Sequence, residues 1–200
     1  MILKRLGRIQ DSDLPLEPTE LPRPIPTGDE VLIKVSACGV CHTELDIIEA
    51  RTPPPKLPVI PGHQVIGRVV ESASAQSGLR IGERVGVGWI FSACGKCEYC
   101  LAGQENLCAD FRATGRDANG GYAEYVIVPA PFCYPIPDPI PDLEAAPMLC
   151  AGAIGYRSLN LAAIQDGDIL GLSGFGASAH LVLKMARYRY PNAELFVFTR

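Results

Sequence analysis

Four cysteines within a fifteen-residue stretch are the side chains best suited to chemistry. They follow the pattern C-x2-C-x2-C-x7-C and are Cys94, Cys97, Cys100 and Cys108. Four thiolates at this spacing can close a tetrahedral cage around zinc, with each sulfur about 2.3 Å from the metal. The residues between them are mostly polar or glycine, which predicts a loop rather than a core element. Disulfides or free thiols are the alternative, and disulfides would require an oxidising compartment to which nothing in the sequence points.

A second set of candidate ligands is spread along the chain and consists of Cys41, His63 and Cys150. Two thiolates and one imidazole would leave the fourth tetrahedral position open, as a catalytic zinc requires. The two thiolates would also cancel the charge of the metal, so the site could lie in an apolar cleft. Taken alone these residues are weak evidence, because a single buried cysteine is often a small core residue.

A glycine-containing turn follows a short apolar run near the C-terminus and precedes a helical pattern. Its key positions are Gly171, Ser173, Gly174 and Gly176. This strand–turn–helix context is typical of the dinucleotide fingerprint G-x-G-x-x-G, whose glycines let the backbone approach a pyrophosphate. Ser173 occupies the second glycine position, and we expect the adjacent Gly174 to compensate. The alternative is an ordinary glycine-rich turn.

The residues that would select the cofactor are Thr199 and Arg200, at the end of the next predicted strand. An acidic residue there would hold the ribose 2′-hydroxyl of NAD. This chain has none, whereas an arginine can pair with a 2′-phosphate. The sequence therefore favours NADP over NAD, the alternative being that Arg200 is a solvated surface charge.

The elements that must position these residues change in character along the chain. Proline and glycine are abundant in the first three quarters, and they separate four short β-like runs at 31–35, 65–71, 84–87 and 122–128. This spacing predicts a compact β-barrel or sandwich. A proline-rich stretch, 129–147, ends at the predicted domain junction, so the domains are 1–147 and 148–200.

The second domain reads as α/β. A helical pattern covers 145–163, and it is followed by a strand at 169–172, a helix at 177–188 and a strand at 195–198. This β-α-β order starts a parallel nucleotide-binding sheet. Because a doubly wound sheet needs more than two strands, we expect an incomplete Rossmann domain.

Composition excludes several classes of protein. The chain has 200 residues, of which 48% are hydrophobic and 20% charged, with a formal net charge of -4. A mildly acidic balance argues against nucleic acid or anionic membrane as the partner. The first ten residues contain no continuous apolar run, so neither a secretory signal nor a membrane span is expected. We therefore predict a cytoplasmic protein, where clustered cysteines more often bind metal than form disulfides.

Together these motifs resemble the zinc-dependent alcohol dehydrogenases of the medium-chain dehydrogenase/reductase family. The matching segments occur in the family's order and are residues 38–45, Pro61-Gly-His63, 94–108, 120–126 and 149–152. The resemblance implies a GroES-like β-domain that carries two zinc ions, followed by a Rossmann domain. It also implies hydride transfer between a small alcohol or aldehyde and NAD(P). Complete members are longer, are commonly homo-oligomers, and return their C-terminus to the first domain.

The resemblance also implies roles for individual residues. Cys41, His63 and Cys150 would bind the catalytic zinc, and the four clustered cysteines would bind the structural one. Thr43 would accept the proton of the alcohol, and His42 would lie near the cofactor pyrophosphate. Trp89 would line the substrate pocket, where a bulky indole favours small substrates; the alternative is a plain core tryptophan.

Two positions depart from the family pattern. Gln64 follows His63 where members usually have a glutamate behind the metal, and an amide cannot supply that charge. Asp46 stands where many members have a relay histidine, so the proton would leave through Asp46 or directly to water. Of the remaining candidates, Cys38 and Cys133 are expected to fill space, and His180 to be a packing or surface residue.

Three functions remain open from the sequence. The first is a zinc-dependent alcohol dehydrogenase, and the second is an NADPH-preferring aldehyde reductase of the same family. The third is a non-catalytic zinc-bound fragment of such an enzyme. The polyol dehydrogenase branch is disfavoured because it tends to have glutamate where this chain keeps Cys150, and the zinc-free quinone reductases are disfavoured by both intact ligand sets.

Overall fold

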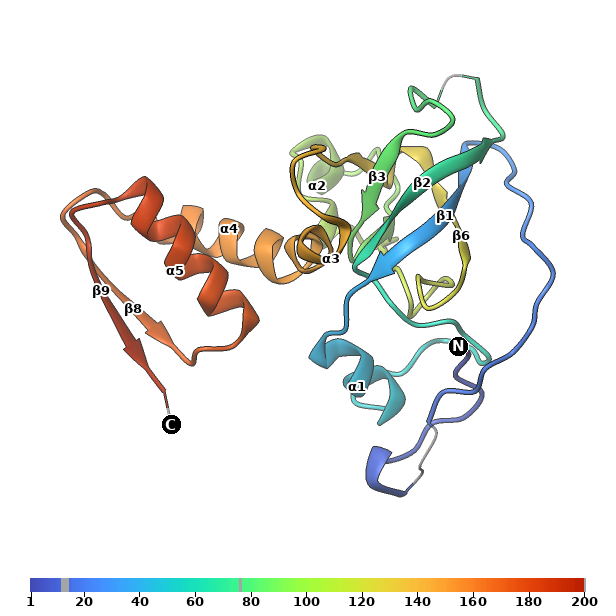
Figure 1. Cartoon of the computed structure of the whole chain (residues 1–200), viewed down its shortest axis with the longest axis horizontal. Coiled ribbons are helices and arrows are strands. Elements are labelled where there is room, and N and C mark those ends of the chain that lie inside the picture. The colour runs from blue at the N-terminus through green and yellow to red at the C-terminus, as the bar shows by residue number, and fades with distance from the viewer. Residues whose placement is uncertain (12–14, 76, 200) are drawn as a thin grey trace. The chain divides into compact units, whose positions relative to one another are not determined.

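The computed structural model describes residues 1–11, 15–75 and 77–199, which divide into two compact units (Figure 1). The first is Met1–Ala146 and the second is Pro147–Arg200. Among the described residues, no helix has both the length and the apolar character needed to cross a membrane.

A five-stranded antiparallel sheet forms the first unit, with strand order β6-β1-β2-β3-β7 (Figure 1). Its strands are β1 (Glu30–Cys38), β2 (Val65–Ser72), β3 (Arg84–Val87), β6 (Tyr125–Pro129) and β7 (Tyr134–Pro135). A separate two-stranded sheet pairs β4 (Ile90–Ser92) with β5 (Arg112–Ala113).

The predicted strands lie where the β-like runs were found, except that the last begins at Tyr125 rather than Tyr122. The backbone N–H groups of Gly121 and Tyr122 instead donate to the carbonyls of Gly62 and Pro61. These N–H groups are therefore not available to a sheet ladder, and the segment before β6 takes an irregular path.

The core of the first unit is built from β-branched side chains on facing strands. Val31 lies opposite Val128, and Ile33 lies opposite Val126, in the register of β1 with β6. All four are buried in one cluster with the valines of β2 and β3. Branched side chains pack well on a pleated surface, which is why this sheet can serve as a rigid support for loops.

Short helical segments complete the first unit. The α-helices are α1 (His42–Ile48), α2 (Glu98–Leu101) and α3 (Asp142–Ala145), and the 3-10 turns are η1 (Ile9–Asp11), η2 (Glu105–Leu107) and η3 (Ala130–Phe132). Helix α1 buries Ile47 and Ile48 in a second cluster with Leu3 and Val59. The cysteine segment, predicted as a loop, therefore contains two short helical turns, α2 and η2.

The second unit begins within η4 (Ala146–Leu149) and contains α4 (Ala151–Ala162), β8 (Ile169–Ser173), α5 (Ala177–Arg189) and β9 (Glu194–Phe198). Strands β8 and β9 are parallel, with Ile169 opposite Glu194 and Ser173 opposite Phe198. Leu159 of α4 and Val182 and Ala186 of α5 are buried together over these strands. This is the predicted β-α-β arrangement.

The helical pattern predicted over 145–163 holds for only part of that range. Ala146–Leu149 form a 3-10 turn, and α4 begins at Ala151. Pro147 has no backbone N–H, so it cannot donate a helical hydrogen bond at this point. Cys150 then leaves helical geometry altogether, with φ -126° and ψ -79°, before α4 begins.

Candidate metal centres

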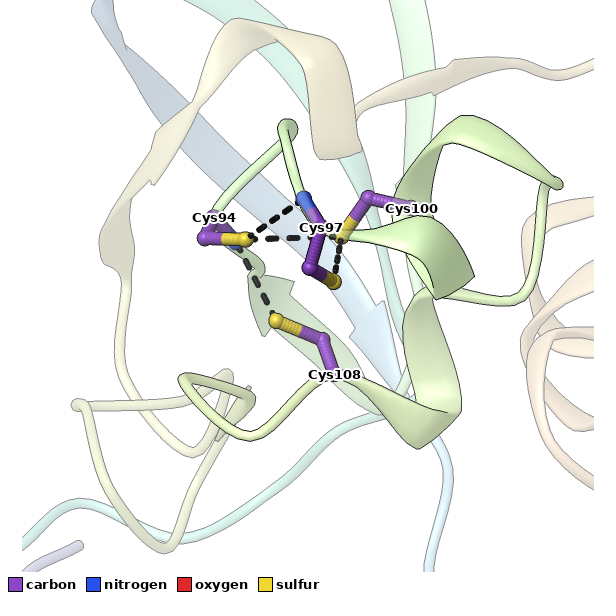
Figure 2. A group of neighbouring side chains, drawn as sticks. All are labelled: Cys94, Cys97, Cys100 and Cys108. Atoms are coloured by element: carbon purple, nitrogen blue, oxygen red, sulfur yellow. Dashed lines mark hydrogen bonds between the residues drawn. The ribbon is translucent and has the colours of Figure 1, made fainter.

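The sulfur atoms of the four-cysteine cluster point toward one another (Figure 2). All four Sγ atoms lie within 4.8 Å of each other, with 3.5 Å between Cys97 and Cys100 and 3.9 Å between Cys94 and Cys100. In a tetrahedral zinc site with bonds of about 2.3 Å the sulfurs would be about 3.8 Å apart. The donor set and its spacing therefore fit zinc, and no disulfide joins any of the eight cysteines.

Backbone N–H groups and burial shift the thiol pKa values of this cluster in opposite directions. The N–H groups of Lys96 and Cys97 lower the pKa of the Cys94 thiol to about 6. Burial, followed by the hydrogen bond with Cys97, raises the pKa of Cys100 to about 12. One thiolate is thus already favoured without metal, while Cys100 must release its proton when a metal binds.

The segment that carries the cluster, residues 94–108, is called the cysteine lobe. It has almost no hydrophobic core of its own. Neither α2 nor η2 contains a buried residue, and of the four cysteines only Cys108 is buried. A segment that buries so little apolar surface cannot offset the entropy of ordering its backbone. The fold of this lobe is therefore expected to depend on its metal.

The first unit also contains two of the three ligands predicted for the second metal site, Cys41 and His63. Cys41 immediately precedes α1, and His63 lies on the segment before β2. The Cys41 Sγ and a ring nitrogen of His63 lie within 4.8 Å of each other. The hydroxyl of Thr43 is 3.7 Å from the Cys41 sulfur. Cys41 thus lies close to both an imidazole and a hydroxyl, and sulfur and imidazole nitrogen are ligands that zinc prefers.

Glu44, for which no role was predicted, contacts both ligands of the pair. Its Oε1 is 2.6 Å from Nδ1 of His63, and its Oε2 accepts the backbone N–H of Cys41 at 2.7 Å. Both Glu44 and His63 are at most 2% exposed. The sequence signal was present, because Glu44 lies three residues after Cys41, the N-cap of α1, and an acidic residue at this spacing is the capping-box pattern.

Close backbone packing fixes the segment that carries His63. Gly62 has φ +100°, a conformation that glycine adopts without strain. A Cβ on Gly120 would lie 2.0 Å from the carbonyl oxygen of Gly62, so only glycine fits there. The side chain of Asn119 accepts the backbone N–H of Ile60 at 3.0 Å, and Gly120 donates to the Ile60 carbonyl.

Trp89 lies beside His63. The ring centroids are 5.1 Å apart and the rings are nearly perpendicular. The indole is half-buried, because it also packs against the cluster that contains Ile47 and Val59. Trp89 therefore contacts both a core cluster and a candidate ligand.

The second unit contains the third candidate ligand and the glycine turn. Cys150 is the residue that precedes α4. In the turn, Gly174 has φ +83° and donates its N–H to the Phe198 carbonyl at 2.7 Å. A Cβ added to Gly174 or Gly176 would meet no atom of the described residues within 4 Å, so this backbone is open to an approaching group. Ser173 remains in strand β8.

Comparison with known proteins decides the family. The sequence profile of the alcohol dehydrogenase GroES-like domain matches residues 27–138, which is more than half of the chain. The chain belongs to the alcohol dehydrogenase family. A probable alcohol dehydrogenase, AdhA, of Mycobacterium tuberculosis is 45% identical over 203 residues, covering 99% of this chain and 58% of that protein.

Solved structures of family members are also similar to this chain. A thermostable alcohol dehydrogenase from Pyrobaculum aerophilum with cobalt and zinc bound has a TM-score of 0.88 and 25% identity, covering 100% of this chain and 58% of that one. A Helicobacter pylori enzyme named CAD, in complex with NADP(H), has a TM-score of 0.80 and 28% identity, covering 87% and 52%. The chain thus spans little more than half the length of these alcohol dehydrogenase relatives.

Two departures from the alcohol dehydrogenase pattern now have a structural context. Gln64 is buried, and its Oε1 packs closely against Gly39. A Cβ added to Gly39 would lie 2.5 Å from this Oε1 atom. The carboxylate that contacts His63 is that of Glu44. Asp46 forms an ion pair with Arg51, and its Oδ1 is 3.7 Å from Nε2 of His42.

The remaining predicted residues differ in their exposure, and one of them lies outside the described residues. His42 is 75% exposed. Burial raises the pKa of the Cys38 thiol to about 12, and it does the same for Cys133, so both are inert, space-filling thiols as expected. His180 is exposed and its ring contacts Phe175. Thr199 is exposed after β9, and Arg200 lies outside the described residues.

Proposed function

We propose that this chain is the zinc-binding part of an alcohol dehydrogenase that transfers a hydride between a small alcohol or aldehyde and NAD(P). The observation that carries the proposal is the meeting of Cys41 and His63 beside the Thr43 hydroxyl, with Glu44 buried behind them. In this proposal residues 1–147 are the GroES-like catalytic domain and 148–200 begin the Rossmann domain. We further propose a cytoplasmic homo-oligomer for the full-length protein.

The chain would hold two zinc ions. The four-cysteine cluster would bind a structural ion, for which its sulfur spacing and missing core are the support. Cys41 and His63 would bind the catalytic ion, with Cys150 as the third ligand. Two thiolates and one imidazole leave one coordination position for substrate. The relative from Pyrobaculum aerophilum, with cobalt and zinc bound, is consistent with metal at such sites.

The residues around the pair would then handle the proton of the alcohol. Zinc, when bound, supplies a Lewis acid that lowers the pKa of the alcohol, and the nicotinamide accepts the hydride from the alcohol carbon. Thr43 would accept the hydroxyl proton. Because Asp46 is already paired with Arg51, we propose that this proton passes from Thr43 to water rather than through Asp46. Trp89 would limit the space beside His63 and favour small substrates.

For the cofactor we propose NADP in preference to NAD. The described end of β9 offers Thr199 and no carboxylate, so a ribose 2′-hydroxyl would lack its usual acceptor. The open backbone at Gly174 and Gly176 suits the close approach of a pyrophosphate. The Helicobacter pylori relative is complexed with NADP(H). An NADPH-preferring aldehyde reductase is therefore the second candidate function.

A zinc count combined with an activity assay tests the proposal. We expect native mass spectrometry to find two zinc ions per chain, one in Cys41→Ala and one in Cys97→Ala, with Cys133→Ala retaining both. Oxidation of small alcohols and reduction of their aldehydes would then be measured with NADP and with NAD. Two zinc ions without turnover would identify a non-catalytic zinc-bound fragment. A single ion in the wild-type chain that is still bound in Cys41→Ala would contradict the catalytic site.

A further inference from the structure

Trp89, the only tryptophan of the chain, is enclosed by two further side chains besides His63. The Phe111 ring centroid is 6.4 Å away and tilted by 38°. The guanidinium of Arg116 lies 5.4 Å from the indole centroid. An arginine over the face of tryptophan is attracted by the negative face of the ring, and tryptophan is the aromatic residue for which this attraction is strongest.

Arg116 is itself held in a fixed orientation by Asp117. Its Nε donates to Oδ1 of Asp117 at 2.9 Å, and its Nη2 donates to Oδ2 at 2.7 Å. Two parallel charge-assisted hydrogen bonds fix both the position and the plane of a guanidinium. The side chains are only 27% and 12% exposed, so solvent competes weakly for these bonds.

Asp117 is in turn tied to the backbone of the small sheet. Its Oδ2 accepts the N–H of Ala113 at 2.7 Å, and its carbonyl accepts Nη2 of Arg112 at 3.0 Å. Burial raises the pKa of Asp117, but the hydrogen bonds from Arg116 and Ala113 outweigh it and leave the pKa lowered. The carboxylate is therefore charged at neutral pH, and β5 supports a rigid Asp117–Arg116–Trp89 chain of contacts.

We propose that Arg116, clamped by Asp117, sets the orientation of Trp89 beside His63 and so determines which alcohols the site accepts. Arg116 is a positioning residue, since it acts through the indole. This inference rests on the proposed function for its consequence in catalysis, whereas the placement of Trp89 stands on the contacts alone. While the clamp is intact the indole stays against His63 and leaves room for short alcohols.

Substitution Arg116→Met tests the clamp because it keeps an unbranched apolar stem and removes the guanidinium with its charge and its paired hydrogen bonds. We expect Trp89 to gain rotational freedom. Since Trp89 is the only tryptophan, the fluorescence of the whole chain reports on it. The Stern–Volmer constant for acrylamide quenching should rise about twofold, because the indole is released from its cation–π contact with Arg116. That contact is worth a factor of about three to ten in the equilibrium between the held and the released indole.

Arg23→Met is the matched control. Arg23 also combines an aromatic ring and a carboxylate, with its guanidinium 4.9 Å from the Tyr125 centroid and an ion pair to Glu71. It does not contact Trp89, so the quenching constant should stay at the wild-type value. Unchanged quenching and an unchanged emission maximum in Arg116→Met would overturn the inference.

The catalytic consequence is measured as a ratio of kcat/KM values for benzyl alcohol and ethanol. We expect this ratio to rise about three- to tenfold in Arg116→Met and to stay constant in Arg23→Met. If the wild-type chain turns over no alcohol, the proposed activity of this chain fails, while the fluorescence result still decides the clamp. The role of Arg116 in specificity would be contradicted if Arg116→Met is active and more easily quenched, but its ratio of kcat/KM values equals that of the wild type.

A second variant, Asp117→Asn, covers the case in which Arg116→Met does not fold. It leaves Arg116 in place but weakens the paired hydrogen bonds between residues 116 and 117. It should therefore raise the quenching constant by a smaller amount than Arg116→Met. Circular dichroism and retention of one zinc by the four-cysteine cluster establish that each variant is folded. Quenching at the wild-type value in folded Asp117→Asn would argue against the clamp.

Discussion

The carboxylate of Glu44 lies 2.6 Å from Nδ1 of His63, and both side chains are shielded from solvent. When the Nδ1–H group of His63 donates a hydrogen bond to this carboxylate, Nε2 carries the lone pair that a metal requires. The other oxygen of Glu44 accepts the N–H of Cys41. One buried carboxylate thus orients an imidazole and positions a thiol that are 22 residues apart in the sequence.

We expect Glu44→Gln to weaken metal binding at the Cys41–His63 pair by about 10- to 100-fold, the usual effect of losing a carboxylate partner of a ligating histidine. The four-cysteine cluster should keep its zinc. Competition with a chromogenic chelator measures both affinities. Glu30→Gln is the control, because Glu30 also accepts a backbone N–H three residues earlier, from Thr27 at 2.9 Å, but lies away from any candidate ligand. Equal affinities in both variants would contradict the role of Glu44.

Removal of metal should unfold the cysteine lobe before the rest of the first unit. The lobe has almost no buried apolar residue, whereas the five-stranded sheet has a continuous core. With a strong chelator, limited proteolysis should cut first between Cys94 and Cys108. Cys97→Ala should be cut there without chelator, while Cys133→Ala should not, because Cys133 belongs to the sheet core. Uniform cleavage along the chain would contradict this expectation.

Gly120→Ala should damage the segment that carries His63. The new Cβ would lie 2.0 Å from the carbonyl oxygen of Gly62, and backbone cannot yield as a flexible side chain can. Overpacking of this kind costs about 1–3 kcal/mol of folding free energy, which denaturant unfolding measures. We also expect loss of the zinc at the Cys41–His63 pair. Gly7→Ala serves as the control, since nothing lies within 4 Å of its Cβ position.

The ion pair between Arg84 and Asp142 should make stability depend on pH. A hydrogen bond from Ser36, together with Arg84, lowers the pKa of Asp142 in the folded chain. A lowered folded pKa stabilises the fold above the unfolded value of about 3.9, and this contribution is lost as the pH falls through the folded pKa. Asp142 is 37% exposed, so we expect solvent to limit the contribution to about 1 kcal/mol.

The measurement is the difference in unfolding free energy between wild type and Asp142→Asn. It should be about 1 kcal/mol at pH 7 and should shrink progressively below about pH 4. Asp138→Asn, an exposed position in the same segment, should leave stability unchanged at both pH values. A difference that stays constant down to about pH 3 would show that the Asp142 carboxylate is not the source.

Much of the fold could be predicted because it is encoded locally. The runs at 31–35 and 84–87 are short, rich in valine and bounded by turn residues, which suffices to predict strands, and the glycine turn at 171–176 carries its own signal. The prediction over 145–163 holds only in part, because the helical composition of that stretch continues through Cys150. Only the neighbouring Pro147 marks the interruption, and a proline does not reveal where the next helix resumes.

The four-cysteine cluster could be identified from the residues alone, because its ligands lie on one short segment whose spacing restricts them to a cage. The family could be identified in the same way, since the matching motifs occur in one order along the chain. The contacts of Glu44 with His63 and of Arg116 with Trp89 became visible only in the folded chain. Such contacts join segments 19 and 27 residues apart, and their geometry depends on strand register and loop packing that no local pattern encodes.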